Sequence, residues 1–202
     1  MAASPSTVGI FNRALALLGG EQLSTVEGPW EKSALGILCV NNFPGVLDMA
    51  LEAHDWSFAR AREDLAEKPE TRPRRNYSRR YALPSACLRP LELTGGWPFI
   101  LEGSDLLTDA APAELHYIQR VEDPRVWPPA FQTALAWGLA AVLAAAKTND
   151  PRIQQACFER YNVTLLEAMA RDNNMQQPAD EPTEWERARF GQPGASRWRR
   201  DG

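Results

Sequence analysis

An uninterrupted apolar run of thirteen residues, from Ala134 to Ala146, constrains the fold of this chain more than any other feature. The run reads ALAWGLAAVLAAA and has no polar face at helical spacing, so a helix formed here has to be covered on several sides. It is too short to cross a bilayer, which needs about 20 apolar residues. We predict a buried central helix over 129–147, begun by Pro128-Pro129. Its apolar stripe is predicted to contain Phe131, Leu135, Leu139, Val142 and Leu143.

Helical periodicity also marks the N-terminal quarter of the chain. Ser6 is a candidate N-cap for a helix over 6–18, and two glycines follow as a stop signal because glycine readily adopts the left-handed conformation. A second helical region is predicted over 30–54. Pro44 interrupts it, and proline inside a helix costs about 3 kcal/mol. The region is therefore either one kinked helix or two helices with Pro44 near the first turn of the second.

The C-terminal part contains one more helix and then loses its periodicity. Asp150 and Pro151 predict a helix start, with the aspartate as N-cap of a helix over 151–172. One face of this predicted helix contains Ile153, Cys157, Tyr161, Leu165 and Met169. Residues 173–202 are rich in Asn, Gln, Pro, Glu, Gly and Arg and show no periodicity, which predicts an extended tail outside the core.

The middle of the chain has a strand-like pattern instead. Short β-like pieces are separated by turn residues, and they cover 77–83, 87–93, 99–102, 106–108 and 114–121. Gly103-Ser104 predicts a tight hairpin turn. In the last piece apolar and polar residues alternate, with Ile118 as the exception.

Together these patterns predict an α+β fold. It is mainly a bundle of about four helices with a small antiparallel β-rich insertion over about 75–121. The helical and β-rich segments form one domain over 1–172, followed by an extended tail over 173–202. Trp56 and Phe58, which follow the second helix, are expected in the core rather than at an interface.

Charge and cysteine content argue against several functions. The chain has 22 basic and 26 acidic residues, a formal net charge of −4, whereas autonomous DNA-binding proteins usually have a basic surplus. Three widely spaced cysteines have no metal-ligand spacing and indicate free thiols in a reducing compartment. The N-terminus has no signal-peptide pattern. We predict no interaction with a membrane.

No catalytic motif is found in the sequence. A Ser-x-Gly elbow, HExxH, P-loop, GxGxxG and Cys-x-x-Cys are all absent. His54 stands at a predicted helix end, where it is expected to interact with the last carbonyls, and His116 is expected on the surface. Glu63 and Asp64, taken as adjacent residues on a helix, point apart and do not suggest a glycosidase pair. We predict that the protein is not an enzyme and has no catalytic residue, metal site or cofactor.

A basic cluster is the first candidate contact surface. Residues 60–89 contain nine basic and four acidic side chains, a local charge of +5 in an acidic protein. The cluster fits contact with an acidic neighbouring subunit, a solvated linker and strand edge, or contact with phosphate. The residues that we assign to an inter-subunit or tail-facing surface are Arg72, Arg74, Arg75, Arg79 and Arg80.

The aromatic C-terminal tail is the second candidate. From residue 185 onward it holds five arginines against two acids, and it also carries three large aromatic residues. Aromatic and arginine side chains supply buried area and bidentate hydrogen bonds when a partner orders them. The alternative is a solvated tail. The proposed docking residues are Trp185, Arg187, Arg189, Phe190, Trp198 and Arg199.

Several segments resemble one family in their content and order. They are IFNRALALLGGEQLSTVEG, LDMALEAHDWSFARAREDLA, YALPSACLRPLEL, ILEGSDLLTDAAPAELHYIQRVEDPRVWPPAFQTALAWGLAAVLA and IQQACFERYNVTLLEAMARD. The most specific combination is W-S-F-A-R, then L-P-x-x-C-L-R, then L-T-D and Y-I-x-R-V-x-D-P. Over roughly residues 7–172 the chain resembles the head-to-tail adaptor (connector) proteins of tailed bacteriophages, and is similar to tail tubular protein A of short-tailed phages and related portal adaptors.

The resemblance implies a structural virion protein. Such adaptors form a ring, usually of twelve copies, beneath the portal protein, join the DNA-filled head to the tail or nozzle protein, and extend the DNA ejection channel. Genomic double-stranded DNA passes through without sequence-specific binding. The expected location is the head–tail junction of the virion, after assembly in the host cytoplasm. Assigning portal docking to the tail over 173–202 rests only on its composition and on analogy with the family.

A closed ring needs two different complementary faces on each subunit. The alanine-faced helix over 129–147 and the basic 60–89 region are expected to supply them. Two alternatives stay open. A tail-associated cell-wall hydrolase predicts an inward-facing carboxylate pair or a metal site. A nucleic-acid-binding module predicts salt-dependent binding of free DNA by the isolated protein.

Overall fold

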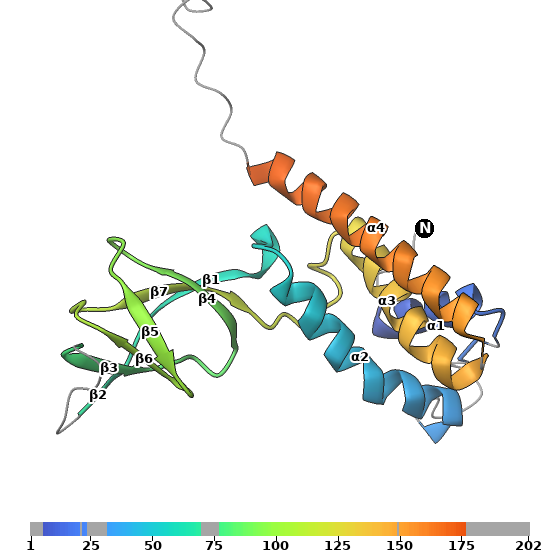
Figure 1. The fold of residues 1–202 in the computed structure, drawn as a ribbon, viewed down its shortest axis with the longest axis horizontal. Helices are drawn as coiled ribbons and strands as arrows, with labels where there is room; N and C mark the ends of the chain where they lie inside the picture. Colours follow the sequence, from blue (N-terminus) through green and yellow to red (C-terminus); the bar gives the residue numbers. More distant parts are fainter. Residues whose placement is uncertain (1–5, 21, 24–31, 70–76, 149, 177–202) are drawn as a thin grey trace, which may run out of the picture.

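The computed structural model describes residues 6–20, 22–23, 32–69, 77–148 and 150–176, and the structural statements that follow concern these residues. A helical part and a β part lie side by side, joined where α2 leads into β1 and where β7 leads into α3 (Figure 1). Four helices and two antiparallel sheets confirm the predicted α+β class.

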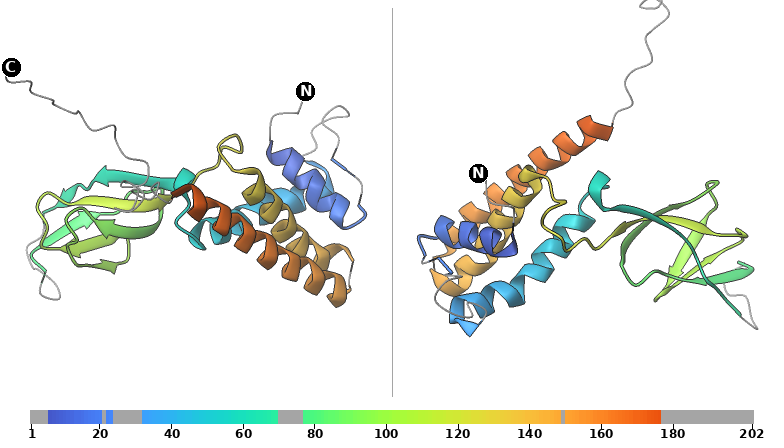
Figure 2. Two further views of the ribbon diagram at one scale, coloured as in Figure 1. Left: turned by 90° about the horizontal axis from the view of Figure 1, so that it is seen from above. Right: turned by 180° about the vertical axis from the view of Figure 1, so that it is seen from behind.

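The helical part is built around the apolar helix. The four helices are α1 (Thr7–Leu17), α2 (Ala34–Glu52), α3 (Pro129–Lys147) and α4 (Pro151–Gln176). Helix α3 contacts the other three, and Figure 2 shows it between α1 and α4. Its buried face includes Phe131, Leu135 and Leu139, as predicted, but Val142 is 41% exposed. Val142 instead lines an apolar hollow together with residues of α2 and α4.

The helix ends follow the predicted chemistry with two changes. The hydroxyl of Ser6 accepts a hydrogen bond from Gly9 N at 3.1 Å, and Gly19, at a φ of +63°, ends α1. The carboxylate of Asp150 caps α4 by accepting from Arg152 N at 2.9 Å. Helix α4 continues to Gln176, beyond the predicted end. Helix α2 begins after its N-cap Ser33 and is a single helix with Pro44 inside it, which decides between the two alternatives.

Two helices, α2 and α3, are long and apolar enough to cross a membrane by length and composition alone. Helix α3 has 19 residues, whereas the apolar run that is too short to cross a bilayer has thirteen. A buried core helix of a folded domain passes the same test, and α3 is packed against three other helices. Its apolar composition is therefore explained by packing inside the bundle.

The β part contains two small antiparallel sheets. One has the order β1 (Arg60–Asp64), β7 (Glu114–Gln119), β4 (Cys87–Leu93). The other has the order β2 (Glu67–Lys68), β3 (Arg79–Ala82), β6 (Asp105–Thr108), β5 (Phe99–Glu102). The predicted hairpin is confirmed, with Gly103 at a φ of +63° and Glu102 paired to Asp105.

The start of the β part corrects the sequence prediction. Glu63 and Asp64 lie on strand β1 rather than on a helix, and β1 pairs along its whole length with β7. The segment RARED has no apolar alternation of its own, so its pairing is set by a partner more than fifty residues away. On a strand the two carboxylates point to opposite faces of the sheet, so they still do not form a pair.

Two hydrophobic cores result. The larger lies among the helices and includes Trp56, while the smaller lies in the β part around Tyr81, Leu106 and Leu115. Ile118 on β7 belongs to the helical core, which explains why it breaks the alternation of that strand. Trp56 is 1% exposed and its Nε1 donates to Ala50 O at 2.8 Å, confirming its predicted place in the core. Phe58 is partly buried and packs against this core.

Candidate functional site

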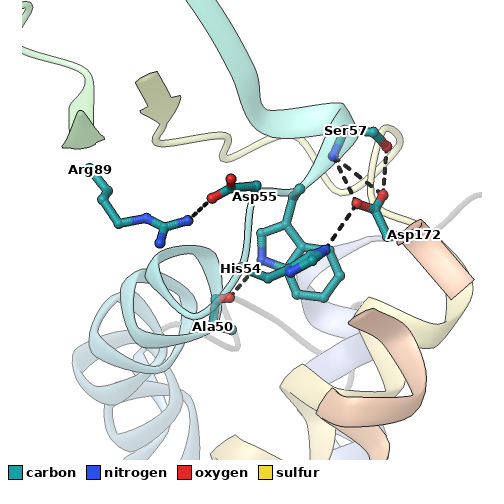
Figure 3. A network of polar contacts seen from close by, with 7 residues as sticks. Ala50, His54, Asp55, Ser57, Arg89 and Asp172 are labelled. Atoms are coloured by element: carbon teal, nitrogen blue, oxygen red, sulfur yellow. Dashed lines mark hydrogen bonds and ion pairs between the residues drawn. The ribbon is translucent and has the colours of Figure 1, made fainter. Parts of the chain in front are cut away.

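A buried polar network joins the end of α4 to the turn between α2 and β1 (Figure 3). The carboxylate of Asp172 is 1% exposed. It accepts hydrogen bonds from Ser57 N at 3.1 Å and from the Ser57 hydroxyl at 2.6 Å. His54 Nε2 lies 3.4 Å from Asp172 Oδ2. The imidazole also packs edge-on against Trp56, at 4.9 Å between the two ring centroids.

The residue types in this network are those of a catalytic triad, but their order in space is different. In a triad the histidine stands between the serine and the carboxylate and accepts the serine proton. Here Asp172 stands between the other two, and the hydroxyl of Ser57 donates directly to it. This geometry holds α4 against the start of β1 and does not activate Ser57. The predicted contact of His54 with helix-end carbonyls is replaced by its contacts with Asp172 and Trp56.

Two ion pairs connect the β part to the helical part beside this network. Arg89 on β4 pairs with Asp55, as Figure 3 shows. Arg120, just after β7, pairs with Asp48 on α2 at 2.8 Å. Both basic side chains come from the β part. Asp48 lies on α2, and Asp55 lies in the segment between α2 and β1. The junction is therefore fixed by charge pairing as well as by the buried network.

Of the six basic side chains of the cluster that the structure describes, four form ion pairs within the subunit, namely Lys68, Arg79, Arg80 and Arg89. Arg79 pairs with Glu67 at 2.8 Å, and Arg80 with Glu102 at 3.0 Å. Lys68 hydrogen-bonds to Asp105, which lowers the pKa of that carboxyl group. The sequence could not show this pairing because the acids come from other strands of the same sheet. The positive charge available to a neighbouring subunit is smaller here than the local count of basic residues suggests.

The other predicted site residues fall outside the described ranges. They are Arg72, Arg74 and Arg75 of the basic cluster and Trp185, Arg187, Arg189, Phe190, Trp198 and Arg199 of the tail. Their assignment remains a prediction from sequence. His116 is partly exposed on β7, 3.9 Å from a carboxylate oxygen of Glu92, in keeping with its expected surface position.

An apolar groove that the sequence did not reveal lies between α2, α3 and α4. Its volume is about 400 Å³. The lining residues are Val46, Met49, Gly138, Ala141, Val142, Pro151, Gln154, Gln155, Phe158 and Tyr161. Met49 is 58% exposed and Phe158 is 46% exposed. We call this surface the α2–α4 groove. The sequence signal for it was Phe158, an aromatic residue outside the apolar face that was predicted for its helix.

A second apolar hollow of about 280 Å³ lies elsewhere on the helical part. It is lined by residues of α1, α2 and the segment after β7, namely Thr7, Phe11, Val40, Phe43, Pro44, Leu47, Arg120 and Glu122. The two hollows have no lining residue in common. The helical part therefore offers two different apolar surfaces.

The expected alanine-faced interface on α3 needs correction. Ala134, Ala136 and Ala140 have no exposed surface, and Ala141 and Ala144 are also buried. The other helices cover these side chains within the subunit, so they are not free to contact a neighbour. Helix α3 contributes to the surface with Val142, with Ala145 and Ala146 near its C-terminal end, and with part of the lining of the α2–α4 groove.

Within the described ranges, no three or more His, Cys, Asp or Glu side chains are grouped so as to hold a metal ion. Burial raises the pKa of the Cys39 thiol to about 11 and also raises the pKa values of Cys87 and Cys157. Such thiols are poor nucleophiles and metal ligands near neutral pH. A scan of protein-family models and a search of curated proteins gave no match to this chain.

Proposed function

We propose that the protein is a structural subunit of the head–tail junction of a tailed bacteriophage. It forms a ring, of twelve copies as in most such adaptors, beneath the portal, and extends the DNA channel toward the tail or nozzle. The order of the helical and β segments along the chain is consistent with the adaptor resemblance.

The observation that carries this proposal is the distribution of exposed apolar side chains. Of thirteen large apolar residues that the described chain exposes, ten lie on the four helices. Contiguous apolar surface on a folded domain marks sites of interaction. Two distinct apolar hollows on the helical part suit a ring, whose subunits meet through two different faces. A protein whose task is assembly needs this kind of surface more than it needs a polar catalytic cleft.

Association with the portal tests the proposal directly. The protein is mixed with the portal ring from the same genome, and the product is imaged by electron microscopy. We expect a second ring stacked on the portal. The experiment is repeated with the chain cut after Gln176, because a cut after Asp172 would remove the last turn of α4.

The truncated chain separates two parts of the proposal. Loss of the stacked ring on truncation assigns portal docking to the tail, including Trp198 and Arg199. A ring that survives truncation keeps the adaptor function and moves the docking surface to the folded part. A full-length protein that does not associate with the portal contradicts the proposed function and returns the hydrolase and the nucleic-acid-binding module to consideration. Where a tail tryptophan is replaced by alanine instead of being removed by truncation, Trp97→Ala is the matched control, because Trp97 is an exposed aromatic residue of the β part.

A further inference from the structure

The α2–α4 groove is an apolar surface that the folded part of the chain leaves open. Phe158 and Val142 line it with 46% and 41% of their surface exposed, and the buried Tyr161 also belongs to its lining. A volume of about 400 Å³ accommodates large side chains from another segment. Leaving this much apolar surface in water is unfavourable by about 25 cal/mol for each Å².

The sequence contains a segment of matching chemistry. Residues 177–202 follow α4 and include Trp185, Phe190 and Trp198. Aromatic residues bury about 150–250 Å² each, so one or two of them suffice to cover such a groove. Pro178 is two residues beyond the last residue of α4, a position where proline commonly follows a helix end.

The tail is long enough to reach the groove of its own subunit. At about 1.5 Å per residue, Phe158 lies about 27 Å along α4 from Gln176. Phe190 is fourteen residues beyond Gln176 and reaches up to about 46 Å at about 3.3 Å per residue. Trp185, nine residues beyond, reaches about 30 Å. Phe190 can therefore reach the groove without a fully extended backbone, whereas Trp185 can reach only the end of the groove that is nearest to Gln176.

We propose that in the free subunit residues 177–202 fold back along α4 and cover the α2–α4 groove of the same chain, with Phe190 seated between Phe158 and Val142. A tethered segment acts at an effective concentration in the millimolar range, far above that of a neighbouring copy in a micromolar solution. The tail of the same chain is therefore the favoured occupant.

This contact has a consequence for assembly that rests on the proposed function. If the groove is one face of the ring interface, a tail seated in it blocks ring closure. A portal that captures the aromatic tail then exposes the groove at the place where the ring has to form. The contact would thereby delay ring formation until the subunit meets the portal.

Photocross-linking on the full-length chain tests the contact without any portal. The photoreactive residue p-benzoylphenylalanine replaces Phe158 in one protein and Val142 in a second, both exposed enough to accept it. The control protein carries Leu101→p-benzoylphenylalanine on β5, where the native side chain is 47% exposed. Cross-linked peptides are identified by mass spectrometry over a tenfold range of protein concentration.

We expect cross-links from positions 158 and 142 to peptides of 177–202 in the monomer, with a yield independent of concentration. The yield from position 101 is expected to be much lower. Phe190→Ala should reduce the yield by about tenfold, since burial of one large apolar side chain contributes a factor of this order. Equal yields at all three positions, or no tail peptide, would overturn the proposal. So would tail cross-links found only in dimers, because they assign the groove to a neighbouring copy. Portal binding is measured separately, so the contact and the proposed function fail independently.

Discussion

Single residues at the junction decide how the two parts of the molecule meet. Asp172 and Thr108 are the buried polar or charged residues of the described chain. Asp172 is placed by α4, Ser57 by the turn after α2, and His54 by the end of α2. A buried carboxylate is tolerated only when donors compensate for its lost hydration. The network therefore fixes the direction in which β1 leaves the helical part.

Asp172→Ala should lower the free energy of unfolding by about 2–3 kcal/mol. The change removes the buried carboxylate that accepts from Ser57 N and from the Ser57 hydroxyl, and a hydrogen bond to a charged group contributes about 1.5–3 kcal/mol to stability. Urea denaturation followed by circular dichroism measures the effect. Glu167→Ala, at an exposed position of the same helix, is the control and should change stability by less than about 0.5 kcal/mol. Equal effects of the two substitutions would mean that the network does not hold the junction.

Thiol reactivity provides a second test at the residue scale. Cys39 has no exposed surface, and desolvation raises its pKa to about 11, so it stays a neutral thiol at pH 8. Cys157 is also buried, while Cys87 on β4 is partly exposed. With an aromatic disulfide reagent at pH 8, Cys87 should react first, and the other two only as the chain unfolds. Rapid reaction of Cys39 in the folded protein would contradict its placement between the helices.

At the scale of elements, the sequence predicts those helices and turns that are determined by residues close together in the chain. The four helices follow from periodicity, capping residues and glycine stops, and the β5–β6 hairpin follows from Gly103-Ser104. Strands β1 and β2 could not be found in this way, because their residues are mostly charged; β1 also depends on the distant strand β7, and β2 has only two residues. The candidate surfaces show the same limit. Arg79 and Arg80 are identifiable from sequence, but the acids that pair with them, Glu67 and Glu102, lie on other strands and are brought close only by the pairing of the sheet.

The packing of α3 against its neighbours depends on the missing side chain of Gly138. A Cβ at this position would lie 2.9 Å from Val46 Cγ1 and 3.0 Å from the Tyr161 ring. Gly138→Ala should therefore lower the free energy of unfolding by about 1–2 kcal/mol, because overpacking outweighs the gain in helix propensity. Gly45→Ala in α2 is the matched control. A Cβ there meets nothing within 4 Å, so this substitution should stabilise the protein by up to about 1 kcal/mol. Thermal unfolding of both variants measures the difference. Stabilisation by Gly138→Ala would contradict the prediction, because it would mean that α2 and α4 move apart at little cost to accommodate the added methyl group.

At the scale of the whole molecule, the two hydrophobic cores differ in the surfaces that surround them. The helical core carries the apolar hollows and most of the exposed apolar side chains. The β core is smaller, and the strands around it carry ion pairs made within the subunit. The two are linked by Ile118 and by the pairs Arg89–Asp55 and Arg120–Asp48.

Leu106→Ala tests whether the two cores behave as separate units. Leu106 on β6 has no exposed surface, and its truncation should cost about 2–5 kcal/mol. Because its core contains none of the buried residues of the helical core, we expect faster amide hydrogen exchange in β3, β5 and β6 and unchanged exchange in α3. Leu101→Ala on β5, at an exposed position, is the control and should leave both parts unchanged. If α3 also loses protection, the molecule opens as one cooperative unit. In that case the helical faces that we assign to the ring would depend on an intact β part, and substitutions there would impair assembly from a distance.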